Sequence, residues 1–211
     1  MAHITAEDFK GLLETKPLEG IAEEYVFGGE PYCFRNSPAD YVLMRELLAK
    51  GIGLTKDAIT MVGSGKTGFS LDPKNPFLPY TPERDIDVVV VDSELFDAFW
   101  SNLISWSYPL QGSVPPNDWK WFSTHKSDVF WGYFYPGLRL PRSPALPGLI
   151  RPIQKFYTLW RTAFLGLGRY RAFTGLSIDG RLYRTWEHAQ AYHVEGLRLI
   201  LSGLHEKRGK S

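Results

Sequence analysis

The segment that most constrains the fold runs from Asp85 to Val91 and reads Asp-Ile-Asp-Val-Val-Val-Val. Four consecutive valines are β-branched and wholly apolar, which is typical of a strand in a sheet that is covered on both faces. A helix is expected directly afterwards, because large apolar residues between Leu95 and Ile104 recur at the spacing of one helical face. The sequence therefore predicts a mixed α/β (α+β) protein with a small mixed sheet flanked by helices.

The remaining segments supply further candidate elements. In chain order we expect a helix over 38–50, a strand over 58–62, a loop over 63–68, an extended proline-rich connection over 72–83, a helix from Ser93 to about 104, a loop over 112–118, a strand over 129–135, a helix near 153–165, a strand within 172–184 and a final helix after Thr185. These elements predict a single domain over 1–211, with a core at about 37–135 and a C-terminal strand and helix at about 153–205 that complete the site.

Composition limits the class of protein. The chain has 211 residues, a formal net charge of +1 and one cysteine, Cys33, so it cannot form an internal disulfide. A lone cysteine without zinc-ligand spacing favours the cytoplasm. Residues 1–20 lack the apolar core of a signal peptide, and no apolar stretch approaches the roughly 20 residues that span a bilayer, so neither secretion nor membrane insertion is expected.

Charge is distributed unevenly along the chain. Residues 139–184 contain nine arginines and lysines and a single acid, Asp179. Such a segment suits an anionic partner, either a triphosphate or a nucleic-acid backbone, although arginines between aromatic residues also form ordinary solvated faces. Arg181 and Arg184, on the last predicted strand, are candidate contacts to a triphosphate or acceptor, or are charges at a sheet edge.

The loop Gly63-Ser64-Gly65-Lys66-Thr67 allows two interpretations. Its Gly-Lys-Thr ending is that of a phosphate-binding P-loop, which would indicate an NTPase or kinase. However, Thr60 stands where that motif requires its first glycine, and Gly68 and Pro73 leave about one turn of helix after the loop. The P-loop therefore remains the alternative.

The second interpretation joins this loop to Asp85 and Asp87. Side chains alternate along a strand, so these two carboxylates project from one face, with Ile86 on the other. Neighbouring carboxylates repel each other unless a cation neutralises them, and hard oxygen ligands suit Mg²⁺ with substrate phosphates as further ligands. The pattern indicates a magnesium and phosphate site.

An apolar strand, Gly-Ser, and then Asp-Ile-Asp-Val on the next strong strand resembles the nucleotidyltransferase-fold superfamily, the DNA polymerase β-like enzymes. The stretches 63–71 and 84–91 look like a bacterial subgroup of defence-associated enzymes. The resemblance covers about residues 58–106, and it implies a nucleotidyltransferase palm. The connection between Ser64 and Asp85 is longer than the family's usual one, which a loop tolerates.

The resemblance also implies the roles of individual residues. Asp85 and Asp87 would hold two Mg²⁺ ions, which Mn²⁺ could replace, and Gly63 and Ser64 would grip the β- and γ-phosphates, with Lys66 adding positive charge. The family places a third carboxylate on a neighbouring strand. Asp179 is the first candidate, although Asp-Gly is also a turn signal, and Asp128 is the second.

The expected reaction is metal-dependent transfer of a nucleotidyl group from an NTP or dNTP to a hydroxyl, with release of pyrophosphate. The resemblance suggests an oligonucleotide or cyclic messenger as product in bacterial antiphage defence, with a nucleic-acid acceptor or a protein partner as further options. The alternatives are a toxin that modifies tRNA or protein, the P-loop NTPase, and a catalytically dead binding protein. Trp131 and Tyr133 are weaker candidates for stacking a nucleobase. His188 and His193 are five residues apart, which puts them on different faces of a helix, so they are not expected to share a metal.

Overall fold

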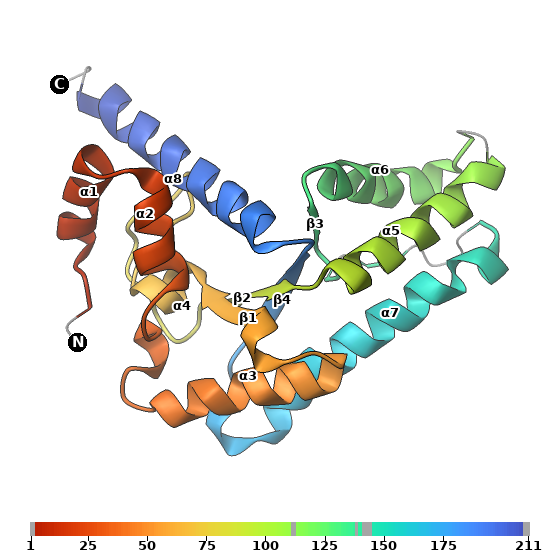
Figure 1. The fold of residues 1–211 in the computed structure, drawn as a ribbon, viewed down its shortest axis with the longest axis horizontal. Helices are drawn as coiled ribbons and strands as arrows, with labels where there is room; N and C mark the ends of the chain where they lie inside the picture. The colour runs from red at the N-terminus through yellow and green to blue at the C-terminus, as the bar shows by residue number, and fades with distance from the viewer. Residues whose placement is uncertain (1–2, 111–112, 138, 141–144, 209–211) are drawn as a thin grey trace.

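The computed structural model describes residues 3–110, 113–137, 139–140 and 145–208 and is built around a four-stranded mixed sheet (Figure 1). The strand order is β1-β2-β4-β3. β2 pairs antiparallel with β1 and parallel with β4, and β3 pairs antiparallel with β4. The strands are β1 (Ile59–Val62), β2 (Ile86–Val91), β3 (Tyr133–Phe134) and β4 (Ile178–Tyr183).

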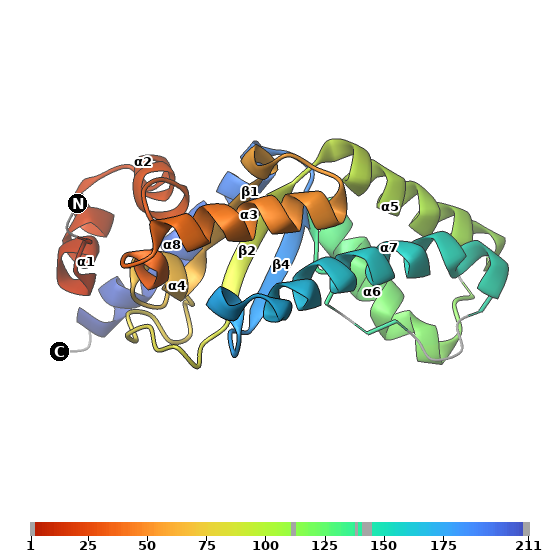
Figure 2. The ribbon, with the colours of Figure 1, turned by 90° about the horizontal axis from the view of Figure 1, so that it is seen from below.

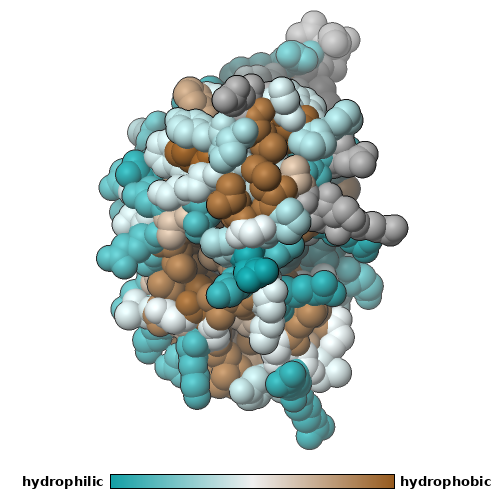
Figure 3. Space-filling view, turned by 90° about the vertical axis from the view of Figure 1, so that its right-hand side faces the viewer, coloured by the Kyte–Doolittle hydropathy of each residue, from teal (hydrophilic) through white to brown (hydrophobic). Residues whose placement is uncertain are grey.

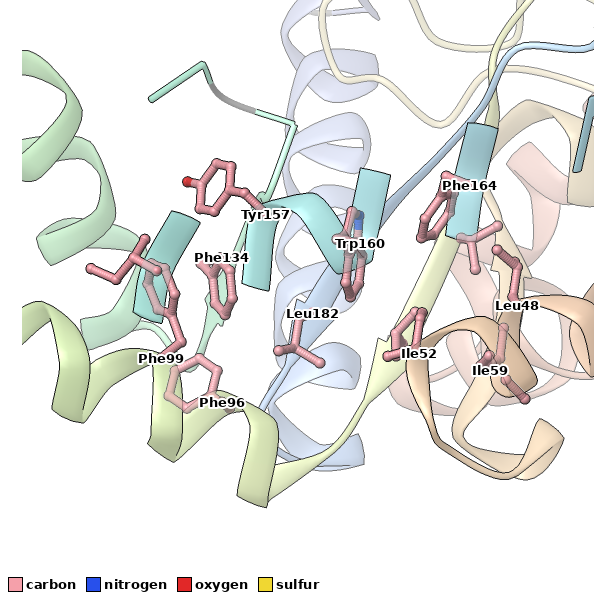
Figure 4. Packing of buried hydrophobic residues seen from close by; sticks show 14 of the residues in the cluster. Leu48, Ile52, Ile59, Phe96, Phe99, Phe134, Tyr157, Trp160, Phe164 and Leu182 are labelled. Atoms are coloured by element: carbon pink, nitrogen blue, oxygen red, sulfur yellow. The ribbon is translucent and has the colours of Figure 1, made fainter. Parts of the chain in front are cut away.

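One face of the sheet carries the larger hydrophobic core. Ile86, Val88 and Val90 point to this face and are almost fully buried. The face is covered by the helices α3 (Pro38–Ile52), α5 (Ser93–Ser107) and α7 (Pro147–Gly166). α3 and α7 lie side by side across it (Figure 2). Aromatic and aliphatic side chains from the strands and helices fill the space between them (Figure 4).

The opposite face carries a second, smaller core. Val62, Val89 and Tyr183 are buried there against the N-terminal segment and the last helix. The covering elements are α1 (Ala6–Thr15), α2 (Leu18–Ile21), the π-helical turn η1 (Ala22–Phe27) and α8 (Trp186–Arg208). The valine run is thus buried from both sides, and the prediction of a small mixed sheet flanked by helices is confirmed.

Short elements connect these layers. They are η2 (Tyr32–Phe34), η3 (Lys56–Ala58), α4 (Gly63–Thr67), η4 (Tyr108–Leu110), η5 (Leu167–Arg169) and η6 (Arg171–Phe173). The predicted loop at 63–68 is therefore mostly a helix of five residues, which Gly68 ends with a φ of 91°. The proline-rich connection is not extended as the sequence predicted: it forms turns at 73–74, 76–77 and 82–83, and it folds back so that Phe69 bridges to Pro79.

The structure corrects the sequence interpretation in the middle of the chain. Residues 116–130 form the helix α6 (Pro116–Phe130), where the sequence predicted a loop over 112–118 and a strand over 129–135. Residue 112 lies outside the described residues. Helix α7 begins at Pro147 rather than near 153, and the last strand is limited to β4. The aromatic run after α6 contributes only the two-residue strand β3, because Trp131 and Gly132 form a turn.

The end of the molecule formed by α5, α6 and α7 exposes hydrophobic side chains between hydrophilic ones (Figure 3). Tyr108, Trp119 and Leu149 are among the exposed large hydrophobic residues of this region. Among the described residues, no helix combines the length and apolarity needed to cross a membrane.

Candidate functional site

A cleft of about 1570 Å³ opens on the α8 side of the sheet, beyond the part that α8 and the N-terminal helices cover. Figure 1 shows the V-shaped arrangement of α8 on one side and β3 with α6 on the other. The floor of the cleft comes from β2 and β4, and one wall comes from α8. Gly63, Ser64, Asp85, Asp87 and Asp179 all line it.

The parallel pairing of β2 with β4 brings two acids together. Asp87 and Asp179 are direct partners in the register, and partners in a sheet project from the same face. Asp85 lies two residues before Asp87, just outside the strand, and is exposed. The structure therefore gathers the two sequence-predicted acids and the first-choice third carboxylate at one end of the sheet. It also shows that Asp179 belongs to a strand and not to a hairpin turn.

The carboxyl group of Asp87 is electrostatically strained. Its pKa is raised to about 6, first because surrounding protein removes it from bulk water and then because Asp85 and Asp179 repel its charge, while Arg181 opposes the rise. The side chain is nevertheless accessible by surface area, so it lies at the bottom of a wet cleft and not in the core. Such a carboxylate would gain from a nearby cation.

Gly63 lies directly against Asp87. Val62 is the register partner of Asp87, and the chain turns after it into α4 with Gly63 at a φ of 70°. A Cβ at Gly63 would overlap Oδ2 of Asp87. Glycine is thus required both for the left-handed conformation and for the close approach of backbone to carboxylate. Ser64, next in the chain, is buried and lines the cleft.

Both oxygens of Asp179 accept hydrogen bonds. The hydroxyl of Tyr135 donates to Oδ2, and the backbone N–H of Gly180 donates to Oδ1 over 2.8 Å. Burial and the bond to Asp179 raise the pKa of Tyr135 to about 12, so the hydroxyl keeps its proton. Sequence analysis did not find Tyr135, because the segment that carries it is irregular beyond β3.

Arg181 lies on the same face as the acids, one alternation further along β4. Its register partner is Val89, and its guanidinium carbon lies 4.6 Å from the ring centroid of Tyr192 and 5.2 Å from that of Tyr133. Its Nε is buried without a hydrogen-bond partner among the described residues. The two tyrosines hold the cation beside the acids. The Asp-x-Arg spacing could have indicated this pairing, whereas the tyrosines come from distant elements.

Other predicted site residues lie elsewhere. Lys66 is buried and does not line the cleft. Its Nζ donates a hydrogen bond to the carbonyl of Gly29 in the N-terminal segment. Burial lowers the pKa of Lys66 to about 8. Arg184 forms an ion pair with Asp97 of α5, at 2.9 Å between Nε and Oδ1. The structure thus gives Lys66 and Arg184 local partners and no place at the acids.

The second choice for the third carboxylate, Asp128, is in the last turn of α6 and not at the start of a strand, and it does not line the cleft. Trp131 is 63% exposed at the cleft wall. Nδ1 of His188, in the first turn of α8, forms a 2.8 Å hydrogen bond with the hydroxyl of Thr185, the residue before the helix. His193 packs edge-on against the ring of Phe27.

The donor chemistry of the acid end suits a hard divalent cation. Carboxylate oxygens are the ligands that Mg²⁺ and Mn²⁺ prefer, and the repulsion felt by Asp87 is what such an ion would relieve. In the described part of the chain, however, no three carboxylate, imidazole or thiol side chains converge tightly enough to hold one ion. The two oxygens of Asp179 already accept hydrogen bonds from Tyr135 and Gly180.

No protein-family model, curated protein or solved structure matches this chain in sequence or fold.

Proposed function

We propose that this protein is a metal-dependent nucleotidyltransferase that moves a nucleotidyl group from an NTP or dNTP to a hydroxyl and releases pyrophosphate. The observation that carries the proposal is the register match of Asp87 with Asp179 beside Gly63 and Ser64. A nucleotidyltransferase palm needs carboxylates on neighbouring strands next to a phosphate-binding turn. The product class and a role in antiphage defence rest on the sequence resemblance alone.

Each residue of the acid end has a task in this reaction. Asp85, Asp87 and Asp179 would hold Mg²⁺ or Mn²⁺, which when bound supplies positive charge to the attacking oxygen and to the leaving pyrophosphate. Gly63 and Ser64 would orient the phosphate tail through a backbone N–H and a hydroxyl. Tyr135 orients the Asp179 carboxylate, and Arg181 keeps a fixed positive charge beside Asp87.

The length of α4 speaks against the P-loop alternative. A P-loop is followed by a helix whose N-terminus faces the phosphates, but α4 has five residues and ends at Gly68. The lysine of the Gly-Lys-Thr sequence is bonded to Gly29. An NTPase of that class would need this lysine at the phosphates.

A second candidate is a nucleotide-binding protein without turnover. The absence of a tight carboxylate group among the described residues favours it. Incubation with α-labelled and γ-labelled NTPs and dNTPs plus Mg²⁺ or Mn²⁺ separates the candidates. Label from the α-phosphate in a product supports nucleotidyl transfer, release of γ-label as phosphate indicates an NTPase, and binding without turnover indicates the second candidate.

Replacing Asp87 by Asn tests the site residue most directly. The amide has the shape of the carboxylate but lacks its charge, so we expect at least a hundredfold loss of α-label transfer with folding retained. Glu195→Gln is the matched control, because Glu195 lines the same cleft on α8 and pairs with Arg198 at the surface. Full activity of a folded Asp87→Asn protein would contradict the proposal.

A further inference from the structure

The chain contains a stretch of 50 residues without any acid. Between Asp128 and Asp179 there are seven arginines and lysines and neither aspartate nor glutamate. The stretch includes all of α7 and the turns η5 and η6 that follow it. A surface that carries one sign of charge attracts a partner of opposite charge.

Five of these cations are described, exposed and clustered on α7 and the turns after it. We call this set the α7 basic face, and its members are Arg151, Lys155, Arg161, Arg169 and Arg171. None of the ion pairs or hydrogen bonds between described residues uses one of their side chains. The ion pairs that do form use cations from other elements.

The geometry of α7 aligns the charges. At 100° per residue, Arg151, Lys155 and Arg161 fall within about 120° of the helix surface, and ten residues of helix separate the outer two by about 15 Å. Arg151 and Lys155 are four residues apart, an arrangement of like charges that weakens a helix. The opposite face of α7 is buried against the sheet through Ile153, Trp160 and Phe164, so the cations point outward.

The cleft is less suited to a long anion than the α7 basic face is. The lining of the cleft includes seven acids, among them Glu187 and Glu195 on α8, against three arginines. A polyanion that ran along the α8 wall would meet these acids, whereas the outer face of α7 offers cations only. Charge complementarity therefore directs a polymeric anion to α7.

We propose that the α7 basic face binds the sugar-phosphate backbone of a nucleic acid. On the proposed function, which this inference extends, that nucleic acid carries the acceptor hydroxyl. Four of the five cations are arginines, which suit phosphate recognition, and Tyr170 is exposed between Arg169 and Arg171, where a base can stack on it.

The α7 basic face is within reach of the acids. Arg171 precedes Asp179 by eight residues, and eight extended residues span at most about 28 Å. That limit corresponds to about eight base steps of a duplex. A strand held at the Arg171 end of the α7 basic face thus lies within this distance of Asp179.

The binding test uses the full chain and a 20-nucleotide, 5′-fluorescein-labelled single-stranded RNA. Fluorescence anisotropy measures the Kd of the complex at KCl concentrations from 50 to 200 mM. Arg151→Gln/Lys155→Gln/Arg161→Gln is the variant of interest, because glutamine keeps the helix propensity and removes the charge. We expect its Kd at 100 mM KCl to rise at least about tenfold and the slope of log K against log salt to lose about 2, the value for three phosphate contacts on a single strand.

Lys50→Gln/Lys120→Gln/Lys126→Gln is the matched control. It removes three exposed lysines outside the α7 basic face, from α3 and α6, and so changes the net charge equally. It should bind RNA within about twofold of the unmodified protein. Equal loss in both variants, or no loss in the α7 variant, would overturn the inference. So would binding of the unmodified protein to vesicles of phosphatidylserine and phosphatidylcholine but not to RNA.

Failure of this inference is distinguishable from failure of the proposed function. Asp87→Asn should bind the RNA as tightly as the unmodified protein, because Asp87 is outside the α7 basic face. If no variant transfers α-label but the α7 variant still loses RNA binding, the proposed reaction is wrong and the binding face stands. If transfer occurs but RNA binding is unaffected by the α7 substitutions, the binding face is wrong.

Discussion

At the scale of single residues, the acid end depends on how closely a backbone can approach a carboxylate. Gly63 has a φ of 70° and leaves no room for a Cβ beside Oδ2 of Asp87. The turn that would hold phosphates and the acid that would hold a cation therefore share one contact. A change of one atom at Gly63 should disturb both.

We expect Gly63→Ala to lose stability twice over. The left-handed conformation costs an alanine about 1–2 kcal/mol of unfolding free energy, and displacement of Asp87 adds to this loss. Gly53→Ala is the control, since Gly53 has a φ of 88° but open space around the position of a Cβ. Urea unfolding followed by tryptophan fluorescence should show a larger loss for Gly63→Ala. Equal losses would mean that the contact with Asp87 carries no energy.

At the scale of elements, α5 illustrates how a helix start is fixed by one side chain. Asp92 is the N-cap residue, and its Oδ1 accepts a 2.7 Å hydrogen bond from the backbone N–H of Leu95. The sequence predicted a helix from Ser93 to about 104, and Ser93 is its first residue.

The cap assignment predicts different costs for two adjacent substitutions. Asp92→Ala should lower the free energy of unfolding by about 1 kcal/mol, because it leaves the N–H of Leu95 unpaired and removes a negative charge from the helix N-terminus. Ser93→Ala should change it by less than about 0.5 kcal/mol. Thermal unfolding monitored by circular dichroism measures both. A larger loss for Ser93→Ala would contradict the assigned cap.

Elements with clear local signals were predicted well, and those with mixed patterns were not. The helix over 38–50 and the strand over 85–91 correspond to α3 and β2, because Ser-Pro marks the start of the helix and consecutive valines mark the strand. Helix α6 was missed: Pro115 and Pro116 suggest a loop, and Val129 to Tyr135 is rich in β-prone aromatic residues. Pro116 in the first helical turn was the usable signal.

The same contrast holds at the site. Alternation placed Asp85 and Asp87 on one face, which is a local property of a strand. The register that sets Asp179 opposite Asp87 depends on how α7, which precedes β4 in the chain, packs on the face of the sheet. The contacts of Tyr133 and Tyr192 with Arg181 join three distant segments. The loop motif assigned Lys66 to the phosphates, whereas in the structure Lys66 is buried and bonds to the carbonyl of Gly29.

At the scale of the whole molecule, the buried histidine His125 makes stability depend on pH. His125 is completely buried beside α7, its Nε2 lies 2.5 Å from the hydroxyl of Tyr157, and burial lowers its pKa to about 4. Between pH 4 and 6.5 the unfolded chain binds a proton that the folded protein refuses. Stability therefore falls as the pH decreases through this window.

The expected size of this effect is about 2–3 kcal/mol of unfolding free energy between pH 7 and 4.5, from about 1.4 kcal/mol per pKa unit. Asp87 has the opposite effect on stability. Its pKa of about 6 means that the folded protein binds a proton at a higher pH than the unfolded chain does, so this group stabilises the fold as the pH decreases. Urea titrations of His125→Gln and of the unmodified protein at both pH values isolate the contribution of His125, because both proteins contain Asp87. A His205→Gln control should keep the full pH dependence, and an unchanged dependence in His125→Gln would refute the assignment.

The pairing of β2 with β4 also has a consequence for synthesis. Asp87 and Asp179 stand 92 positions apart along the chain, which at about 5–20 residues per second separates their emergence from a ribosome by about 5–18 s. During that interval the nascent polypeptide carries one half of its acid pair on a strand that can pair with β1 but not yet with β4. Any premature stop upstream of β4 therefore yields a fragment that cannot assemble the pair, so the two acids come together only after translation has passed β4.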